Sequence, residues 1–116
     1  MSMLDCMTAL DNLNINHQDK ATIIGGGGKS PLWRQMIADA LGIELVEMKY
    51  ADSSFGSAML AGVAVGVFEN YQRALEKCNE IVSETKPDME NNKKYKALFK
   101  KYKVVQKALE PIYNEE

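Results

Sequence analysis

Long hydrophobic runs, cysteine motifs and an excess of charge of one sign are all missing from this sequence. Its 14 Lys and Arg residues against 16 Asp and Glu give a net charge of −2 at pH 7, so charge offers no argument for binding to nucleic acid or acidic lipid. Cys6 and Cys78 form no metal or redox spacing. We therefore expect two free thiols in a reducing cytoplasm.

Targeting and membrane segments are lacking as well. Residues 1–16 have neither a basic start nor an unbroken apolar core, so no signal peptide is expected. The most apolar segment, Phe55–Phe68, would extend only about 20 Å as a helix, which is too short to cross a membrane. His17 is the single histidine and has no second ligand or base near it, so we interpret it as an exposed loop residue. The 116 residues make one domain or a piece of one.

One stretch, residues 21–41, reads ATIIGGGGKSPLWRQMIADAL and has the pattern of strand, glycine turn and helix. The β-branched pair Ile23–Ile24 suits a buried strand. Gly25–Gly28 have no Cβ, which permits positive φ angles or the close approach of a ligand. Ser30 is a favourable N-cap, and Pro31 fits the first helical position because an N–H there would have no helical partner. Gly42 is the residue expected to end the helix.

This pattern predicts an anion or nucleotide cradle, because the unpaired N–H groups of the turn and of the first helical residues would share one space with the positive end of the helix dipole. A purely structural turn, needed for close packing of helix on strand, is the alternative that the stretch leaves open. A P-loop is excluded, since the required first glycine falls at Ile23. A dinucleotide fingerprint fits poorly, since its third glycine falls at Ser30.

Hydrophobic periodicity predicts a chain of helices with two parallel strands joined by a right-handed crossover. The strands are expected at 21–24 and 43–48. The helices are expected at 3–13, 31–41, 55–68, 71–83 and 92–113.

Composition predicts which faces of these elements are buried. Glu44 and Glu47 indicate an edge or half-exposed position for the second strand. The helix at 55–68 is almost wholly apolar, so we expect it to be central and buried. Lysines on the last helix are expected to form a solvated face rather than an RNA surface. For the helix at 31–41, the residues expected inside are Leu32, Trp33, Met36, Ile37, Ala40 and Leu41, and those expected outside are Arg34, Gln35 and Asp39.

The run GGGGKSPLWRQMIADALG, followed by a strand and SSFGSAMLAG, resembles the C-terminal end of the FGGY carbohydrate kinases, and among these most nearly the xylulokinases. The family pattern of glycines, Ser, Trp, an Ala-Asp pair and Gly is matched by Gly26–Ser30, Trp33, Ala38–Asp39 and Gly42, with Gly28 where the family has Ala. A later Gly-Ala-Ala element is matched over 56–61. The resemblance covers residues 20–68 well and the rest weakly.

The resemblance implies an α/β fold, part of an actin-like, ribonuclease H-like ATPase C-terminal domain with few parallel strands flanked by helices. Residues 1–116 would be a fragment of the nucleotide-side domain, with 69–116 a helical tail. The implied function is the ATP-side portion of a sugar kinase that transfers a phosphoryl group from ATP with Mg to a sugar hydroxyl, a pentulose such as xylulose. The cofactor-binding residues implied are Gly26, Gly27, Gly28, Lys29, Ser30 and Leu32.

The resemblance also implies what this segment lacks. In the family, the catalytic carboxylate and the sugar pocket come from segments N-terminal to it, so we expect no activity without a missing N-terminal kinase domain. Asp39 is interpreted as a cap or surface partner, and Asp52 as a residue of a helix cap. Open strand edges and uncovered helix faces predict a homo-oligomer. A non-catalytic assembly or binding module from a truncated kinase is the alternative function.

Overall fold

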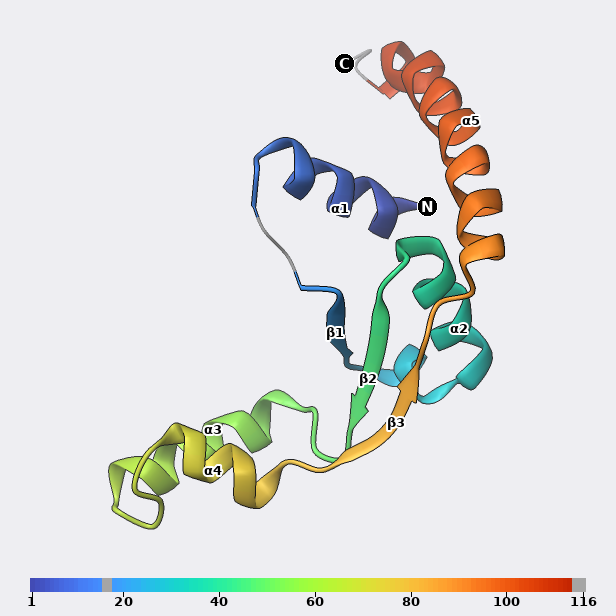
Figure 1. The fold of residues 1–116 in the computed structure, drawn as a ribbon. Coiled ribbons are helices and arrows are strands. Elements are labelled where there is room, and N and C mark those ends of the chain that lie inside the picture. The colour runs from blue at the N-terminus through green and yellow to red at the C-terminus, as the bar shows by residue number, and fades with distance from the viewer. Residues whose placement is uncertain (16–17, 114–116) are drawn as a thin grey trace.

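The structure, a computed structural model, describes residues 1–15 and 18–113 (Figure 1). His17 therefore lies outside the described residues. The elements in chain order are α1 (Ser2–Asn12), β1 (Lys20–Ile23), the 3₁₀ turn η1 (Gly26–Lys29), α2 (Pro31–Leu41), β2 (Glu44–Met48), α3 (Ser53–Ala64), α4 (Tyr71–Cys78), β3 (Ile81–Thr85) and α5 (Met89–Tyr113).

The sheet has three strands in the order β1-β2-β3. β1 pairs with β2 in parallel, from Lys20 opposite Glu44 to Ile23 opposite Glu47, as the expected crossover through α2 requires. β2 also pairs with β3, in the antiparallel direction. The prediction of an edge or half-exposed position for the second strand is therefore right only in its second alternative: β2 is the central strand, and Glu44 and Glu47 are half-exposed.

The helix predicted over 71–83 ends early. α4 stops at Cys78, and the next residue, Asn79, already has an extended backbone with φ −106° and ψ 119°. The following IVSET sequence forms β3, because its β-branched residues suit a strand and the free edge of β2 supplies the hydrogen bonds. Helical spacing of the apolar residues was misleading here, since the pattern runs across the boundary between two elements.

The core lies between α2 and the sheet, where Ile37 and Ala38 of α2 pack with Ile43 and Leu45. The predicted inner face of α2 is wrong in part: Leu32 is 72% exposed. Four further members, Trp33, Met36, Ala40 and Leu41, are exposed or half-buried, and only Ile37 of the predicted set is buried. Arg34 and Asp39, predicted outside, are buried. Both polar side chains find hydrogen-bond partners inside, which makes their burial possible.

Asp39 and Asn92 join the end of α2 to the start of α5. The Asn92 side chain, only 1% exposed, donates from Nδ2 to the carbonyl oxygens of Asp39 (2.8 Å) and Ala40 (3.3 Å). These carbonyls belong to the last turn of α2, where helical partners are missing. Gly42 ends the helix with φ +73°, and a Cβ there would lie 2.9 Å from the Asn92 Nδ2. Its predicted role as the residue that stops α2 is confirmed.

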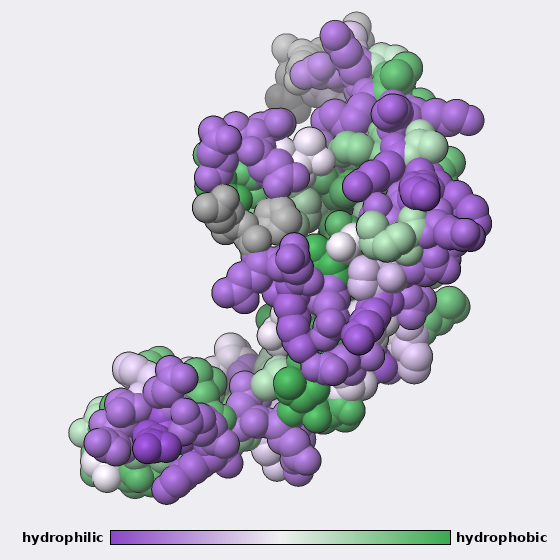
Figure 2. All heavy atoms as spheres, viewed as in Figure 1, coloured by the Kyte–Doolittle hydropathy of each residue, from purple (hydrophilic) through white to green (hydrophobic). Residues whose placement is uncertain are grey.

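α3 and α4 form a hairpin that projects from the sheet (Figure 1). No residue of α3 is buried, and Leu60 is 52% exposed, so the prediction of a buried central helix is wrong. Figure 2 shows apolar atoms beside hydrophilic ones on the visible face of this hairpin. The radius of gyration is 18.3 Å, against about 13 Å for a compact chain of this length, which reflects the projecting hairpin and the long α5.

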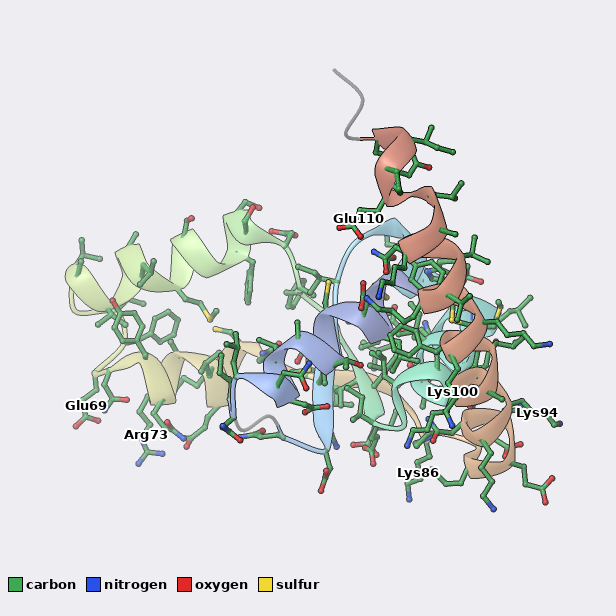
Figure 3. All side chains as sticks on the ribbon, turned by 90° about the horizontal axis from the view of Figure 1, so that it is seen from above. Glu69, Arg73, Lys86, Lys94, Lys100 and Glu110 are labelled. Atoms are coloured by element: carbon green, nitrogen blue, oxygen red, sulfur yellow. The ribbon has the colours of Figure 1, made fainter. Side chains whose placement is uncertain are left out.

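The remaining expectations concern helices and thiols. α5 begins at Met89, three residues before the expected start at Asn92, and its seven lysines between residues 93 and 107 are all exposed. Figure 3 shows Lys94 extending outward from this helix, as expected for a solvated face.

Cys6 and Cys78 are free thiols, as expected. Within the described residues, no helix combines the length and the apolar character needed to span a bilayer.

Replacing Asn92 by Ala is expected to lower the free energy of unfolding by about 1–3 kcal/mol, because the buried carbonyl oxygen of Asp39 and the partly buried one of Ala40 lose their donor. Urea denaturation monitored by circular dichroism measures the change. Lys93→Ala, at the adjacent exposed position, is the control and should change stability by less than about 0.5 kcal/mol. Equal effects of the two substitutions would contradict this role of Asn92.

Asp39 makes the fold sensitive to acid. Burial acts to raise the pKa of this carboxyl group, but hydrogen bonds from the Asp88 amide, Gln35 and Asn91 outweigh burial and lower the pKa below its ordinary value. A lowered pKa stabilises the fold above the unfolded-state value of about 3.9, and this contribution is lost as pH falls through the folded-state pKa. Asp39→Asn should therefore destabilise the protein at neutral pH and progressively less below about pH 4. Urea denaturation between neutral pH and about pH 2.5, with the exposed Asp19→Asn as control, tests this; a destabilisation independent of pH would contradict it.

Candidate functional site

The glycine turn leaves β1 through a backbone that only glycine adopts readily. Gly25 has φ +86° and ψ 176°, a region that costs other residues about 1–3 kcal/mol. The chain then forms one 3₁₀ turn, with Gly28 N–H donating to the Gly25 carbonyl (3.1 Å) and Ser30 N–H donating to the Gly27 carbonyl (3.2 Å). α2 starts immediately afterwards, with Ser30 as N-cap and Pro31 in the first turn, as predicted.

The donors at the start of α2 are largely occupied by the cap itself. Ser30 Oγ accepts from the Trp33 amide (3.3 Å), and the Ser30 carbonyl accepts from the Arg34 amide (3.0 Å). The amides of Gly26 and Gly27 have no acceptor among the described residues, since they open a 3₁₀ turn whose bonds run three residues back. The backbone N–H groups that remain available to a ligand here therefore include those of Gly26 and Gly27 in the glycine turn.

A cavity of about 340 Å³ lies where the carboxyl ends of β1 and β2 meet. The β1 side contributes residues up to and including the glycine turn, and the β2 side contributes the end of the strand and the loop before α3. Its lining residues are Ile23, Ile24, Gly25, Gly26, Gly28, Lys29, Glu47, Met48, Lys49, Ala51 and Asp52. A Cβ on Gly26 would meet no atom within 4 Å, so this glycine borders open space.

The structure places three of the six predicted cofactor residues, Gly26, Gly28 and Lys29, on this cavity. The other three do not line it. Gly27 lies under the indole of Trp33, whose Cδ1 and Nε1 would be 3.1 Å from an added Cβ. Ser30 serves as the helix cap, and Leu32 lies along a separate groove of about 400 Å³ between α2 and α5.

Sequence reasoning missed the β2 half of the cavity. Glu47 was interpreted only as a sign of exposure, Lys49 was not considered, and Asp52 was assigned to a helix cap. The cap assignment is confirmed, because Asp52 accepts from the Phe55 amide (2.8 Å). A usable signal existed nonetheless: in parallel strands joined by a crossover, ligands bind beyond the carboxyl ends, so residues 47–52 belong to the same edge as the glycine turn.

Most of the charges around the cavity are paired. The hydroxyl of Ser54 and then the Phe55 amide lower the pKa of Asp52. The Glu80 carboxylate, 2.8 Å from Lys49 Nζ, raises the pKa of that lysine. Glu47 accepts from Arg34 at 2.7 Å. Lys29 has no ion pair within the described part of the chain, so it can offer its positive charge to an anion in the cavity.

Comparison with known proteins gives a family match. The model of the C-terminal domain of the FGGY family of carbohydrate kinases matches residues 1–65. The xylulose kinase of Staphylococcus epidermidis is 28% identical over 98 residues, which cover 84% of this chain and 20% of that protein. The L-xylulose/3-keto-L-gulonate kinase of Escherichia coli is 30% identical over 111 residues, 92% of this chain and 22% of that protein. The chain thus spans about a fifth of the length of these relatives.

Solved structures show the same fold. The xylulose kinase from Lactobacillus acidophilus superposes with a TM-score of 0.78 at 24% identity over 91% of this chain and 22% of that one. The xylulose kinase from Rhodospirillum rubrum also gives 0.78, at 18% identity over 98% of this chain and 23% of that one. The expected fold class, part of an actin-like, ribonuclease H-like α/β domain, is confirmed, with one antiparallel strand added to the expected parallel pair.

Gly25 and Gly26 provide a matched pair for testing the turn. Gly25→Ala should lower the free energy of unfolding by about 1–3 kcal/mol, because Ala tolerates its φ and ψ poorly. Gly26→Ala should leave stability within about 0.5 kcal/mol, because its Cβ would enter open space. Thermal and urea unfolding measure both, and a larger loss at Gly26 than at Gly25 would show that the turn has another geometry.

Proposed function

The chain belongs to the FGGY family of carbohydrate kinases, and from that premise we propose that it forms the ATP-side portion of an ATP-dependent sugar kinase. The sugar is a pentulose such as xylulose, and the reaction is phosphoryl transfer from ATP, with Mg, to a sugar hydroxyl. The matched relatives named xylulose kinase support this choice of substrate. The segment acts together with the N-terminal part that such kinases possess, and it transfers no phosphoryl group alone.

The proposal rests on the glycine turn, which borders the cavity without side chains and contains backbone N–H groups that have no acceptor among the described residues. These are the N–H groups of Gly26 and Gly27; Gly26 lines the cavity and borders open space, whereas Gly27 lies beside it under Trp33. Phosphate oxygens suit such donors, and the charge of Lys29 adds attraction for an anion. We assign the α-phosphate and the ribose of ATP to the turn of Gly26–Gly28, and the nucleoside to the side of Ser30 and Leu32.

These residues supply binding and orientation. Phosphoryl transfer depends on positioning and on stabilisation of charge on the phosphate oxygens, and backbone donors in a fixed turn provide part of both. No group of three or more His, Cys, Asp and Glu side chains suited to a metal occurs in residues 1–15 and 18–113. The magnesium of the reaction would therefore be held by the phosphates and by groups outside the described residues.

Gly26→Asp tests the site, because it places a carboxylate in the open space proposed for a phosphate. The unsubstituted chain should bind Mg-ADP saturably, and Gly26→Asp should weaken binding at least about tenfold, a free-energy change of about 1.4 kcal/mol. Isothermal calorimetry gives the affinity. Trp33, the single tryptophan, packs over Gly27 and provides an independent fluorescence signal.

Gly56→Asp is the matched control, because a Cβ on Gly56 also meets no atom within 4 Å and Gly56 does not line the cavity. It should leave Mg-ADP affinity unchanged. Equal weakening by both substitutions would contradict a site at the turn. Absence of binding at millimolar Mg-ADP would favour the alternative function, a non-catalytic assembly module, for which the exposed apolar residues of α3 offer a surface.

A further inference from the structure

The side chain of Arg34 links the glycine turn to the sheet through hydrogen bonds to both. Its guanidinium Nη1 donates to the Gly28 carbonyl at 2.6 Å and to Glu47 Oε2 at 2.7 Å. The residue is only 8% exposed. The same carboxylate oxygen of Glu47 accepts from Ser83 Oγ at 3.2 Å, so one chain of hydrogen bonds runs from the turn through β2 to β3.

The Gly28 carbonyl, which accepts from Arg34, is one that has no donor within the 3₁₀ turn itself. Gly28 lies at the C-terminal end of the 3₁₀ turn, where carbonyl groups lack partners within the turn. A cation suits this negative end of the aligned peptide dipoles. The unpaired amides of Gly26 and Gly27 lie at the opposite end of the same turn. A hydrogen bond that holds the Gly28 carbonyl therefore constrains the short turn to which the Gly26 and Gly27 amides belong.

Arg34 is a costly choice for packing alone. Its Nε is buried and has no partner among the described residues, and burial of a charged pair with Glu47 carries a desolvation cost. An apolar side chain would fill the position without that cost. What an apolar side chain cannot do is donate to the Gly28 carbonyl.

We propose that Arg34 is a positioning residue for nucleotide binding: it does not touch the nucleotide but orients the amides of the glycine turn through the Gly28 carbonyl. Through Glu47 and Ser83 it also ties the turn to the antiparallel pair of β2 and β3. The link to nucleotide affinity rests on the proposed function, whereas the control of turn geometry is a property of the ligand-free chain.

The test separates positioning from stability with three variants. Arg34→Met keeps the length of the side chain but removes the donor and leaves Glu47 unpaired. Arg34→Met combined with Glu47→Gln removes the unpaired charge as well. Ser83→Ala removes only the bond between Ser83 and Glu47 and keeps the donor to Gly28. Each variant is measured by thermal unfolding, by Mg-ADP calorimetry and by the amide NMR signals of Gly26 and Gly27 without ligand.

Positioning predicts that Arg34→Met weakens Mg-ADP binding at least about tenfold and moves both amide signals. The double variant should regain most of the lost thermal stability but not the affinity, because the Gly28 carbonyl still has no donor. Ser83→Ala should keep affinity within about twofold of the unsubstituted chain.

Recovery of both affinity and stability in the double variant would overturn the proposal, since Arg34 would then matter only as a buried charge. Unchanged Gly26 and Gly27 signals in Arg34→Met would overturn it too. If the unsubstituted chain binds no Mg-ADP, the proposed function fails by itself, and the amide signals still decide whether Arg34 sets the turn.

Discussion

The parallel pairing of β1 with β2 is the constraint on which the site depends. It brings the carboxyl ends of two strands to one edge, so that the glycine turn and the loop after β2 enclose one cavity. The crossover between the strands must pass through α2, and the cap at Ser30 and the left-handed Gly42 set where that helix starts and stops. Arg34 then acts from inside α2 on the turn that precedes it.

Local signals in the sequence predicted most of the segment from β1 to β2. The cap at Ser30, the helix stop at Gly42 and the parallel strands follow from short-range chemistry that a single stretch reveals. Three of the six predicted cofactor residues line the cavity. The β2 side of the cavity was missed because its residues were considered along their own strand rather than at the shared edge.

Tertiary partners explain what the sequence could not predict. Polarity predicted Arg34 and Asp39 on the outside of α2. Each is buried because a group from another element binds it, Glu47 for Arg34 and the Asp88 amide for Asp39. β3 depends on the free edge of β2, which no local pattern in residues 81–85 reveals. α3 has the composition of a buried helix but is exposed here, in a chain that spans about a fifth of its relatives' length. Composition indicates what a helix can pack against, not whether the partner is present.

The central claim is that backbone amides of the glycine turn receive a phosphate group. Amide NMR of the chain titrated with Mg-ADP and, separately, with adenosine tests it most directly. The account predicts that the Gly26 and Gly27 signals move strongly with Mg-ADP and little with adenosine, which has no phosphate. Shifts centred on the exposed lysines of α5, with the two glycine signals unmoved, would contradict it.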